Sequence, residues 1–234
     1  MFFIGPPFGN YIYLPYTKQI KGSYTLEPRP GLFMQVIKTL RYDFNRNGWK
    51  NKIGLRNPGI NYAIENYNHN HIVSIAVLDK TEILIIEKKI PKNMNIELNV
   101  SCPNAEKEMI NDDLDIFINK EREYCIIKLS PLCDTKLIDN YYKQGFRQFH
   151  CSNTLRTIHG GVSGVSLIPY TNNLIKYLKK YDDVEIISGG GIRYYNDVLN
   201  YKNLGANSFS ASTVFFNPFL AFNLYINYLY NLKK

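Results

Sequence analysis

The sequence Asn99-Val100-Ser101-Cys102-Pro103-Asn104 places two amides, a hydroxyl and a thiol within six residues. It follows residues 94–98, in which apolar and polar side chains alternate, so it is predicted to end a β-strand. Pro103 has no N–H to give to a sheet and stops the strand. A cysteine at this position is a candidate for chemistry; the alternative is a buried thiol in a turn.

Short apolar runs rich in β-branched residues recur along the chain. Eight are predicted to be strands: Phe2–Ile4, Gln19–Thr25, His71–Leu78, Asn93–Cys102, Tyr124–Ser130, Phe146–Ser152, Val184–Ser188 and Asn207–Val214. Helices are predicted at Glu82–Lys89, Ala105–Lys120, Thr135–Lys143, Thr171–Lys180, Asn196–Leu204 and Asn217–Leu232. Strands that alternate with helices form a parallel sheet, and eight of them predict an α/β protein with a (β/α)8 TIM barrel. Residues 1–234 are predicted to form one domain.

The first β/α unit is predicted to be abbreviated. Residues 5–18 (GPPFGNYIYLPYTK) contain too many prolines and glycines for a normal first helix. The segment Gly54–Tyr62 is predicted to be a loop before a short helix, with Pro58 and Gly59 as breakers.

Composition limits the classes of partner. The net charge of +8 suits an anionic partner, but a solvated basic surface explains it equally, and a small phosphate- or carboxylate-bearing ligand fits as well as nucleic acid. The four cysteines show no metal-binding spacing, which predicts reduced thiols in an intracellular protein. No run approaches the roughly 18 apolar residues of a membrane span, so we expect a soluble protein.

Glycines and hydroxyl residues follow the last two predicted strands. In a barrel of this kind, the carboxyl ends of the strands build the active site. Gly189-Gly190-Gly191 and, one strand later, Ser212-Thr213 are typical of a phosphate cradle, because backbone N–H groups there point at the anion. Taken alone, the triple glycine is equally explained as a tight turn.

Lys128 lies within an apolar strand. Its burial would be costly unless an anion pairs with it. One interpretation is a lysine whose ammonium reaches solvent from an exposed strand face. The other places the ammonium near an electron-rich cofactor ring, where it would stabilise negative charge as the ring is reduced.

Together, these motifs resemble the dihydroorotate dehydrogenases, FMN-dependent barrels of pyrimidine biosynthesis. The motifs are NVSCPN at 99–104, IIKLSP at 126–131, SNT at 152–154, GGVSG at 160–164, IISGGGI at 186–192 and LGANSFSAST at 204–213, with GSYTLEPRPG at 22–31 and NKIGLRNPG at 51–59 upstream. The resemblance runs from about residue 19 to residue 216 and preserves the family's order of motifs.

The resemblance implies FMN-dependent oxidation of dihydroorotate to orotate in the de novo synthesis of UMP. Cys102 matches the general base that takes a proton from C5 while hydride leaves C6 for N5 of the flavin. A cysteine here, with no membrane-associated N-terminal extension, matches the soluble class 1 enzymes. Lys128 matches the lysine that contacts the flavin.

The resemblance also assigns the other site residues. Positions that match substrate contacts are Asn51, Gly54, Leu55, Asn99, Asn104, Asn153 and Thr154. Positions that match FMN contacts are Gly22, Ser23, Asn99, Lys128, Ser152, Ser163, Gly164, Gly190, Gly191, Ser212 and Thr213. It implies a cytoplasmic enzyme with a small-molecule substrate and without a metal, nucleic acid or membrane; class 1 relatives are commonly homodimers.

The sequence departs from the class 1 pattern in two segments before residue 42. Gly22 stands where a second lysine is usual, with Lys21 beside it. The segment Gly-Asn-Pro-x-Pro-Arg appears here as residues 31–36 (GLFMQV), so its arginine is lost or displaced to Lys38 or Arg41.

Two loops near the predicted site bear on activity. The hairpin that precedes GGVSG has shrunk to Leu155–His159, and the loop Ala105–Asp113 is the predicted lid. A shortened N-terminal segment and shortened loops around the site would suit a slower enzyme, an enzyme with another substrate, or a barrel that only binds FMN or a nucleotide. A tRNA dihydrouridine synthase is a further alternative, since it too has an Asn-rich strand ending in Cys-Pro.

Overall fold

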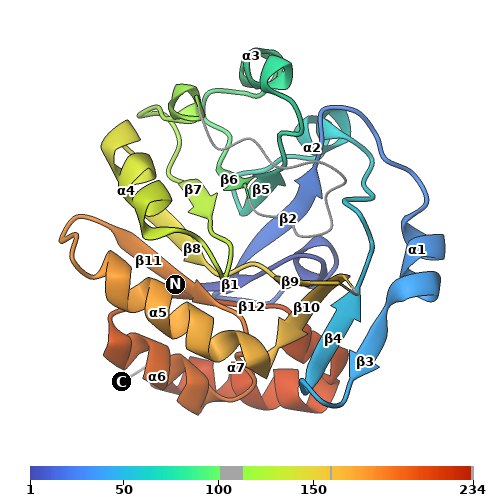
Figure 1. Ribbon diagram of the computed structural model, residues 1–234, viewed down its shortest axis with the longest axis vertical. Helices are drawn as coiled ribbons and strands as arrows, with labels where there is room; N and C mark the ends of the chain where they lie inside the picture. The colour runs from blue at the N-terminus through green and yellow to red at the C-terminus, as the bar shows by residue number, and fades with distance from the viewer. Residues whose placement is uncertain (101–112, 159, 233–234) are drawn as a thin grey trace.

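Eight parallel strands close into a barrel in the computed structural model, which describes residues 1–100, 113–158 and 160–232 (Figure 1). Around the barrel, their order is β1 (Phe2–Ile4), β12 (Ser208–Ala211), β11 (Glu185–Gly189), β8 (Gln148–Cys151), β7 (Cys125–Lys128), β6 (Ile96–Asn99), β5 (His71–Ile75) and β2 (Lys18–Tyr24). Each overlaps one predicted strand, so the predicted (β/α)8 TIM barrel is confirmed.

Helices pack around the outside of the barrel, except α1 (Leu32–Thr39), which has no buried residue and lies farther out (Figure 1). The others are α2 (Ile60–Glu65), α3 (Lys80–Lys89), α4 (Thr135–Gln144), α5 (Ile168–Leu178), α6 (Tyr195–Leu204) and α7 (Pro218–Leu232). Asp79 and Asp134 are the N-caps of α3 and α4, since their carboxylates accept hydrogen bonds from backbone N–H groups of the first turn. None of the helices in the described residues is long and apolar enough to cross a membrane.

The predicted helix Ala105–Lys120 is wrong over residues 113–120. Its residues up to 112 lie outside the described ranges, and the remainder holds only a 3-10 turn, η2 (Asp115–Phe117). Asp113 has a left-handed backbone with φ of 59°, which an α-helix cannot contain. Leu114 and Phe117 are three residues apart and both buried, a spacing that one 3-10 turn satisfies.

The apolar core has two parts, separated by the barrel wall. One lies inside the barrel and consists of Phe3, Ile20, Ile72, Tyr124, Ile126 and Ile187. The other lies between the strands and the surrounding helices, where Ile86 of α3 and Tyr141 of α4 are fully buried. Burying each side chain of this size contributes about 1.5–3 kcal/mol. Since the inner cluster occupies one end of the barrel, the other end is left for polar side chains.

The first β/α unit contains no α-helix, which confirms the predicted abbreviation. Between β1 and β2 the chain forms only the 3-10 turn η1 (Phe8–Asn10). Gly9 makes this shortcut possible, because a Cβ there would lie 2.2 Å from the carbonyl oxygen of Ile20 and 2.4 Å from that of Ile4. The loop therefore packs directly on the backbones of both strands.

A second, antiparallel sheet was not predicted from the sequence. Its strands are β3 (Arg41–Asp43), β4 (Gly48–Asn51), β10 (Gly160–Gly164) and β9 (Leu155–Thr157), in that order. Gly48 of β4 lies opposite Gly164, and a Cβ on Gly48 would lie 2.0 Å from the carbonyl oxygen of Ser163. This close pairing joins residues 41–51 to residues 155–164 (Figure 1).

The buried His71 predicts how stability depends on pH. This side chain begins β5, and burial, with the nearby charge of Lys21, lowers its pKa to about 4. An unfolded histidine titrates near 6.5. Between pH 6.5 and 4 the unfolded chain therefore binds a proton that the folded chain does not, so the free energy of unfolding decreases as the pH falls through this range.

We expect His71→Gln to reduce this decrease. Urea unfolding of the wild type and the variant at pH 7 and pH 5 measures it. His69→Gln is the control, because His69 is exposed and should leave the wild-type pH dependence unchanged. Equal losses of stability in the wild type and in His71→Gln would contradict the assignment.

Candidate active site

Four neighbouring strands direct polar side chains into the barrel, and these side chains meet at one carboxylate. Glu97 of β6 is fully buried. Its Oε1 accepts hydrogen bonds from the Ser74 hydroxyl of β5 at 2.8 Å and from Lys128 Nζ of β7 at 3.3 Å. Its Oε2 accepts one from His150 Nδ1 of β8 at 2.5 Å. The strand register places Ser74 opposite Glu97 and Lys128 opposite His150.

The charges of this cluster compensate one another. Burial by itself would raise the pKa of Glu97, but the charge of Lys128 and the hydrogen bonds from His150 and Ser74 outweigh it and lower that pKa to about 2. Burial lowers the pKa of His150. Lys128 is 8% exposed and forms its ion pair inside the barrel, so it does not extend to solvent. The anion that its burial requires is Glu97.

A chain of hydrogen bonds connects this cluster to the amide side chains at the strand ends. The Ser74 hydroxyl lies 2.9 Å from that of Ser23, which accepts a hydrogen bond from Asn99 Nδ2 at 2.7 Å. Asn99 Oδ1 accepts in turn from Asn153 Nδ2 at 2.8 Å. The orientations of both amides are therefore fixed by a network that ends at Glu97.

These groups border a cavity of about 330 Å³, within the size range of small-molecule sites. Ten of the predicted site residues line it: Asn51, Lys128, Ser152, Asn153, Thr154, Ser163, Gly190, Gly191, Ser212 and Thr213. They come from six segments that are far apart in the sequence. The barrel and the second sheet together form this cavity, because β4 and β10 supply Asn51 and Ser163.

Other predicted residues lie near the cavity without lining it. Ser23 and Asn99 belong to the hydrogen-bond chain. Gly164 lines an adjoining pocket, described below. Gly22 lines a different cavity together with Lys21 and Tyr24, and its N–H donates to Asn10 Oδ1.

Gly54 and Leu55 line none of these three cavities. Two further predicted residues lie outside the described ranges. The carbonyl of Gly54 accepts a hydrogen bond from Arg29 Nε at 3.3 Å, and that of Leu55 accepts one from Asn57 Nδ2 at 2.7 Å. Both carbonyls are thus engaged in local turn contacts. Cys102 and Asn104 fall within residues 101–112, as does most of the predicted lid.

The segment that departs from the class 1 pattern forms helix α1, which the sequence analysis did not predict. Its Leu32 and Val36 line the cavity, together with Leu40. Arg41 instead donates hydrogen bonds to the carbonyl oxygens of Ile37 and Leu40, and neither it nor Lys38 lines the cavity. An apolar wall therefore stands where the family pattern has its arginine.

The turn after β11 lines the cavity and requires glycine at two positions. Gly190 and Gly191 have φ of 81° and 84°, a left-handed conformation that favours glycine. A Cβ on Gly191 would lie 2.5 Å from Ile168 Cγ1, and one on Gly190 would lie 2.9 Å from Leu167 Cβ. Together with Thr213, which lines the same cavity, this turn fits a phosphate-bearing cofactor such as FMN.

Several residues of the site were missed in the sequence. Glu97 has the pattern of a polar residue in an alternating strand, although burial would cost its charge as much as that of Lys128. His150 sits in a similarly apolar strand and lines the cavity. Trp49 and Phe216 stack with ring centroids 4.3 Å apart, and no local pattern predicts that contact between residues so distant in sequence.

No family model matches the chain, but comparison with known proteins finds relatives by sequence. The catalytic subunit of dihydroorotate dehydrogenase B (NAD(+)) from Staphylococcus carnosus is 27% identical, over 74% of this chain and 68% of the relative. The subunit of the same name from Malacoplasma penetrans is 25% identical, over 80% of this chain and 76% of the relative. The subunit of the same name from Petrotoga mobilis is 28% identical, over 77% of this chain and 72% of the relative.

Solved structures share the fold. The ligand-free dihydroorotate dehydrogenase of Eimeria tenella superimposes with a TM-score of 0.68, at 17% identity, covering 88% of this chain and 75% of that one. Its complex with ferulenol gives a TM-score of 0.67 at 16% identity. The chain is therefore similar in sequence to catalytic subunits of dihydroorotate dehydrogenase B, and it shares its barrel fold with the solved dihydroorotate dehydrogenases.

Proposed function

We propose that this protein is an FMN-dependent oxidoreductase that converts dihydroorotate to orotate in de novo pyrimidine biosynthesis. The observation that carries the proposal is the hydrogen-bond chain from Asn153 through Asn99 to Glu97 and Lys128. It joins amides suited to a pyrimidine's carbonyl groups to a buried cation suited to a flavin ring. The names of the sequence relatives support the same reaction.

Residues of the cavity would hold FMN and substrate at opposite sides of the site. The glycine turn, Ser212 and Thr213 would bind the phosphate end of FMN, and Lys128 would lie against its ring system. When bound, FMN supplies the acceptor for the hydride that leaves the substrate. Asn51, Asn153 and Thr154 would orient the substrate, because amide side chains both donate and accept hydrogen bonds.

Cys102 is the proposed general base, by the resemblance of its motif to that of class 1 enzymes. It follows β6, whose last residue, Asn99, belongs to the hydrogen-bond chain. A thiol titrates near 8.5, so the base must act as a thiolate or pass its proton to solvent near neutral pH. Asn104, two residues later, is the proposed second amide contact to the substrate.

The alternatives weighed from the sequence are less well supported. The relatives carry the name of dihydroorotate dehydrogenase, which does not favour a tRNA dihydrouridine synthase. A barrel that binds FMN without turnover is the remaining alternative, and the experiments below distinguish it.

The electron acceptor, the location and the partners of the protein are inferred by analogy with its relatives. The relatives are catalytic subunits of an NAD(+)-linked enzyme, so we infer that electrons leave this protein for NAD(+) through a partner subunit. Cys125, Cys133 and Cys151 are free thiols, which suits a reducing, cytoplasmic location. A homodimer that acts on small molecules, without nucleic acid or membrane, is proposed by analogy with class 1.

Substitution of Cys102 tests the proposed reaction. Anaerobic addition of dihydroorotate should bleach the visible absorbance of FMN in the wild type. Cys102→Ser should retain FMN but reduce it about 10²–10⁴-fold more slowly at pH 7, with partial recovery at high pH, because a hydroxyl is a much weaker acid.

Cys125→Ser is the matched control. Cys125 begins β7, at the opposite end of that strand from Lys128, so its variant should react at the wild-type rate. A wild-type protein that holds FMN yet leaves it oxidised by dihydroorotate would refute the proposed function. An unchanged rate in Cys102→Ser would remove only the cysteine from the mechanism.

The buried ion pair predicts a non-additive effect on stability. Glu97→Gln should lower the free energy of unfolding by about 3–5 kcal/mol, because the carboxylate that balances Lys128 inside the barrel is lost. Adding Lys128→Met to Glu97→Gln should recover part of this loss, since the charge itself is then removed. Chemical denaturation of both variants and of Lys128→Met alone measures the coupling.

Glu123→Gln provides the control for this cycle. It breaks the exposed pair with Lys18, whose atoms are 3.0 Å apart, and should change stability by less than about 1 kcal/mol. Strictly additive losses in the double variant would contradict the assigned pairing.

A further inference from the structure

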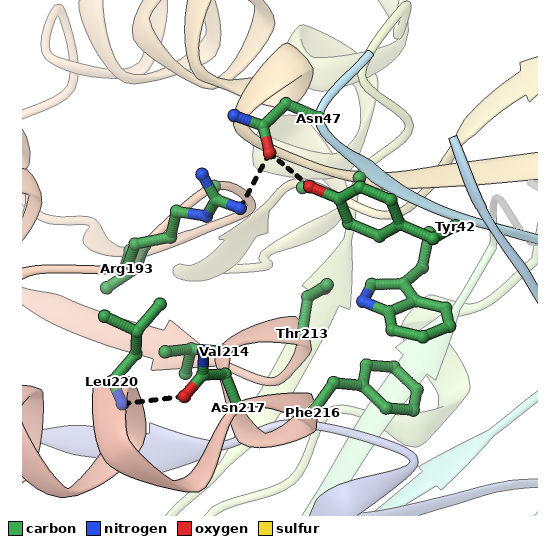
Figure 2. Close-up of a pocket in the computed structure, with 13 residues that line it drawn as sticks. Tyr42, Asn47, Arg193, Thr213, Val214, Phe216, Asn217 and Leu220 are labelled. Carbon is green, nitrogen blue, oxygen red and sulfur yellow. Dashed lines mark hydrogen bonds between the residues drawn. The ribbon is translucent and has the colours of Figure 1, made fainter. Parts of the chain in front are cut away.

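A second pocket of about 290 Å³ adjoins the candidate active site (Figure 2). Gly191, Thr213, Trp49 and Phe216 line both, so the two pockets share a wall. The stacked rings of Trp49 and Phe216 lie at this shared wall. A ligand that extends from one pocket to the other would pass the glycine turn and the Thr213 hydroxyl.

This second pocket contains an arginine that the sequence analysis did not single out. Arg193 follows the glycine turn by two residues and is half-buried. Its Nη2 donates a hydrogen bond to Asn47 Oδ1 at 2.8 Å. The same oxygen accepts a hydrogen bond from the Tyr42 hydroxyl, as Figure 2 shows. The hairpin of β3 and β4 therefore holds the guanidinium in place beside the pocket.

The partner that holds Arg193 is neutral, so the arginine's charge is not balanced locally. Asp197 accepts hydrogen bonds from the backbone N–H groups of Arg193 and Tyr194, at 2.9 and 2.8 Å, and thereby serves the start of α6. Asp43 of the hairpin is paired with Arg46 at 3.0 Å. Within residues 1–100, 113–158 and 160–232, no carboxylate forms an ion pair with the Arg193 guanidinium. The pocket therefore favours an anion.

We propose that Arg193 binds the phosphate of FMN through its side chain, and that Asn47 and Tyr42 are positioning residues for it. The inference rests on the proposed function, which places an FMN phosphate near Gly191 and Thr213. A phosphate monoester carries close to two negative charges, and a guanidinium can donate two parallel hydrogen bonds to it. This side chain would therefore let the site distinguish FMN from riboflavin, which has the same ring and no phosphate.

Binding of the two flavins to the apoprotein tests the proposal without any turnover. Quenching of flavin fluorescence gives the Kd for FMN and for riboflavin. Arg193→Gln should weaken FMN binding about 10- to 100-fold, the effect expected for charge-assisted hydrogen bonds, while riboflavin binding changes less than about twofold. Arg193→Lys should lie between the wild type and Arg193→Gln for FMN, because the charge remains and the paired geometry is lost.

Two further variants separate a positioning role from a structural one. Tyr42→Phe and Asn47→Ala should weaken FMN selectively, by less than Arg193→Gln, and they keep the proposal testable if Arg193→Gln fails to fold. Arg41→Gln is the control, since Arg41 bonds backbone carbonyls and lines neither pocket. It should bind both flavins as the wild type does.

The outcomes distinguish this inference from the proposed function. In one outcome, the wild type binds FMN while Arg193→Gln weakens the binding of both flavins equally, or of neither flavin. In that case Arg193 does not bind the phosphate and the inference is overturned. A wild type that binds no FMN overturns the proposed function and this inference with it. Selective loss of FMN affinity in Arg193→Gln supports the inference, whereas turnover of dihydroorotate is tested separately by reduction of the bound FMN.

Discussion

The arrangement of the site depends on one buried carboxylate. Glu97 lies in the barrel interior, where an ionised group is stable only if charges and hydrogen bonds replace water. Lys128, His150 and Ser74 do so from the neighbouring strands. Because each of these side chains is fixed by its strand, the cluster holds a cation at the base of the cavity in a single orientation. It also anchors the hydrogen bonds that orient the amides above it.

Segments outside the eight barrel strands complete the walls around the shortened first unit and the cavity. The first β/α unit is reduced to a 3-10 turn, and Gly9 lets that turn pack directly on β1 and β2. Helix α1 supplies an apolar wall to the cavity through Leu32 and Val36. The β3–β4 hairpin pairs with β10 and brings Trp49 and Asn51 to the site. Among the described residues, the cavity thus combines an apolar wall with polar side chains from the strand ends.

Two pockets with different chemistry meet at the glycine turn. The larger one combines the apolar face of α1 with the amides and Lys128, which suits a flat, polar-edged ring. The smaller one carries Arg193 beside a neutral amide, which suits an anion. Gly190 and Gly191 allow this junction because a Cβ on either residue would collide with α5 or the turn before it. The pockets together match the two ends of a phosphorylated flavin.

The sequence by itself determined the barrel, the abbreviated first unit and ten of the residues that line the cavity. Alternation and strand-end motifs are local signals, and parallel strands bring their carboxyl ends to one edge of the barrel. Only the tertiary structure decided the partner of Lys128, the second sheet and the place of Arg193. Glu97 looks like any polar residue of an alternating strand until the closed barrel buries it beside Lys128. The pairing of β4 with β10, and the bond from Arg193 to Asn47 across 146 positions, follow from long-range packing that no local pattern encodes.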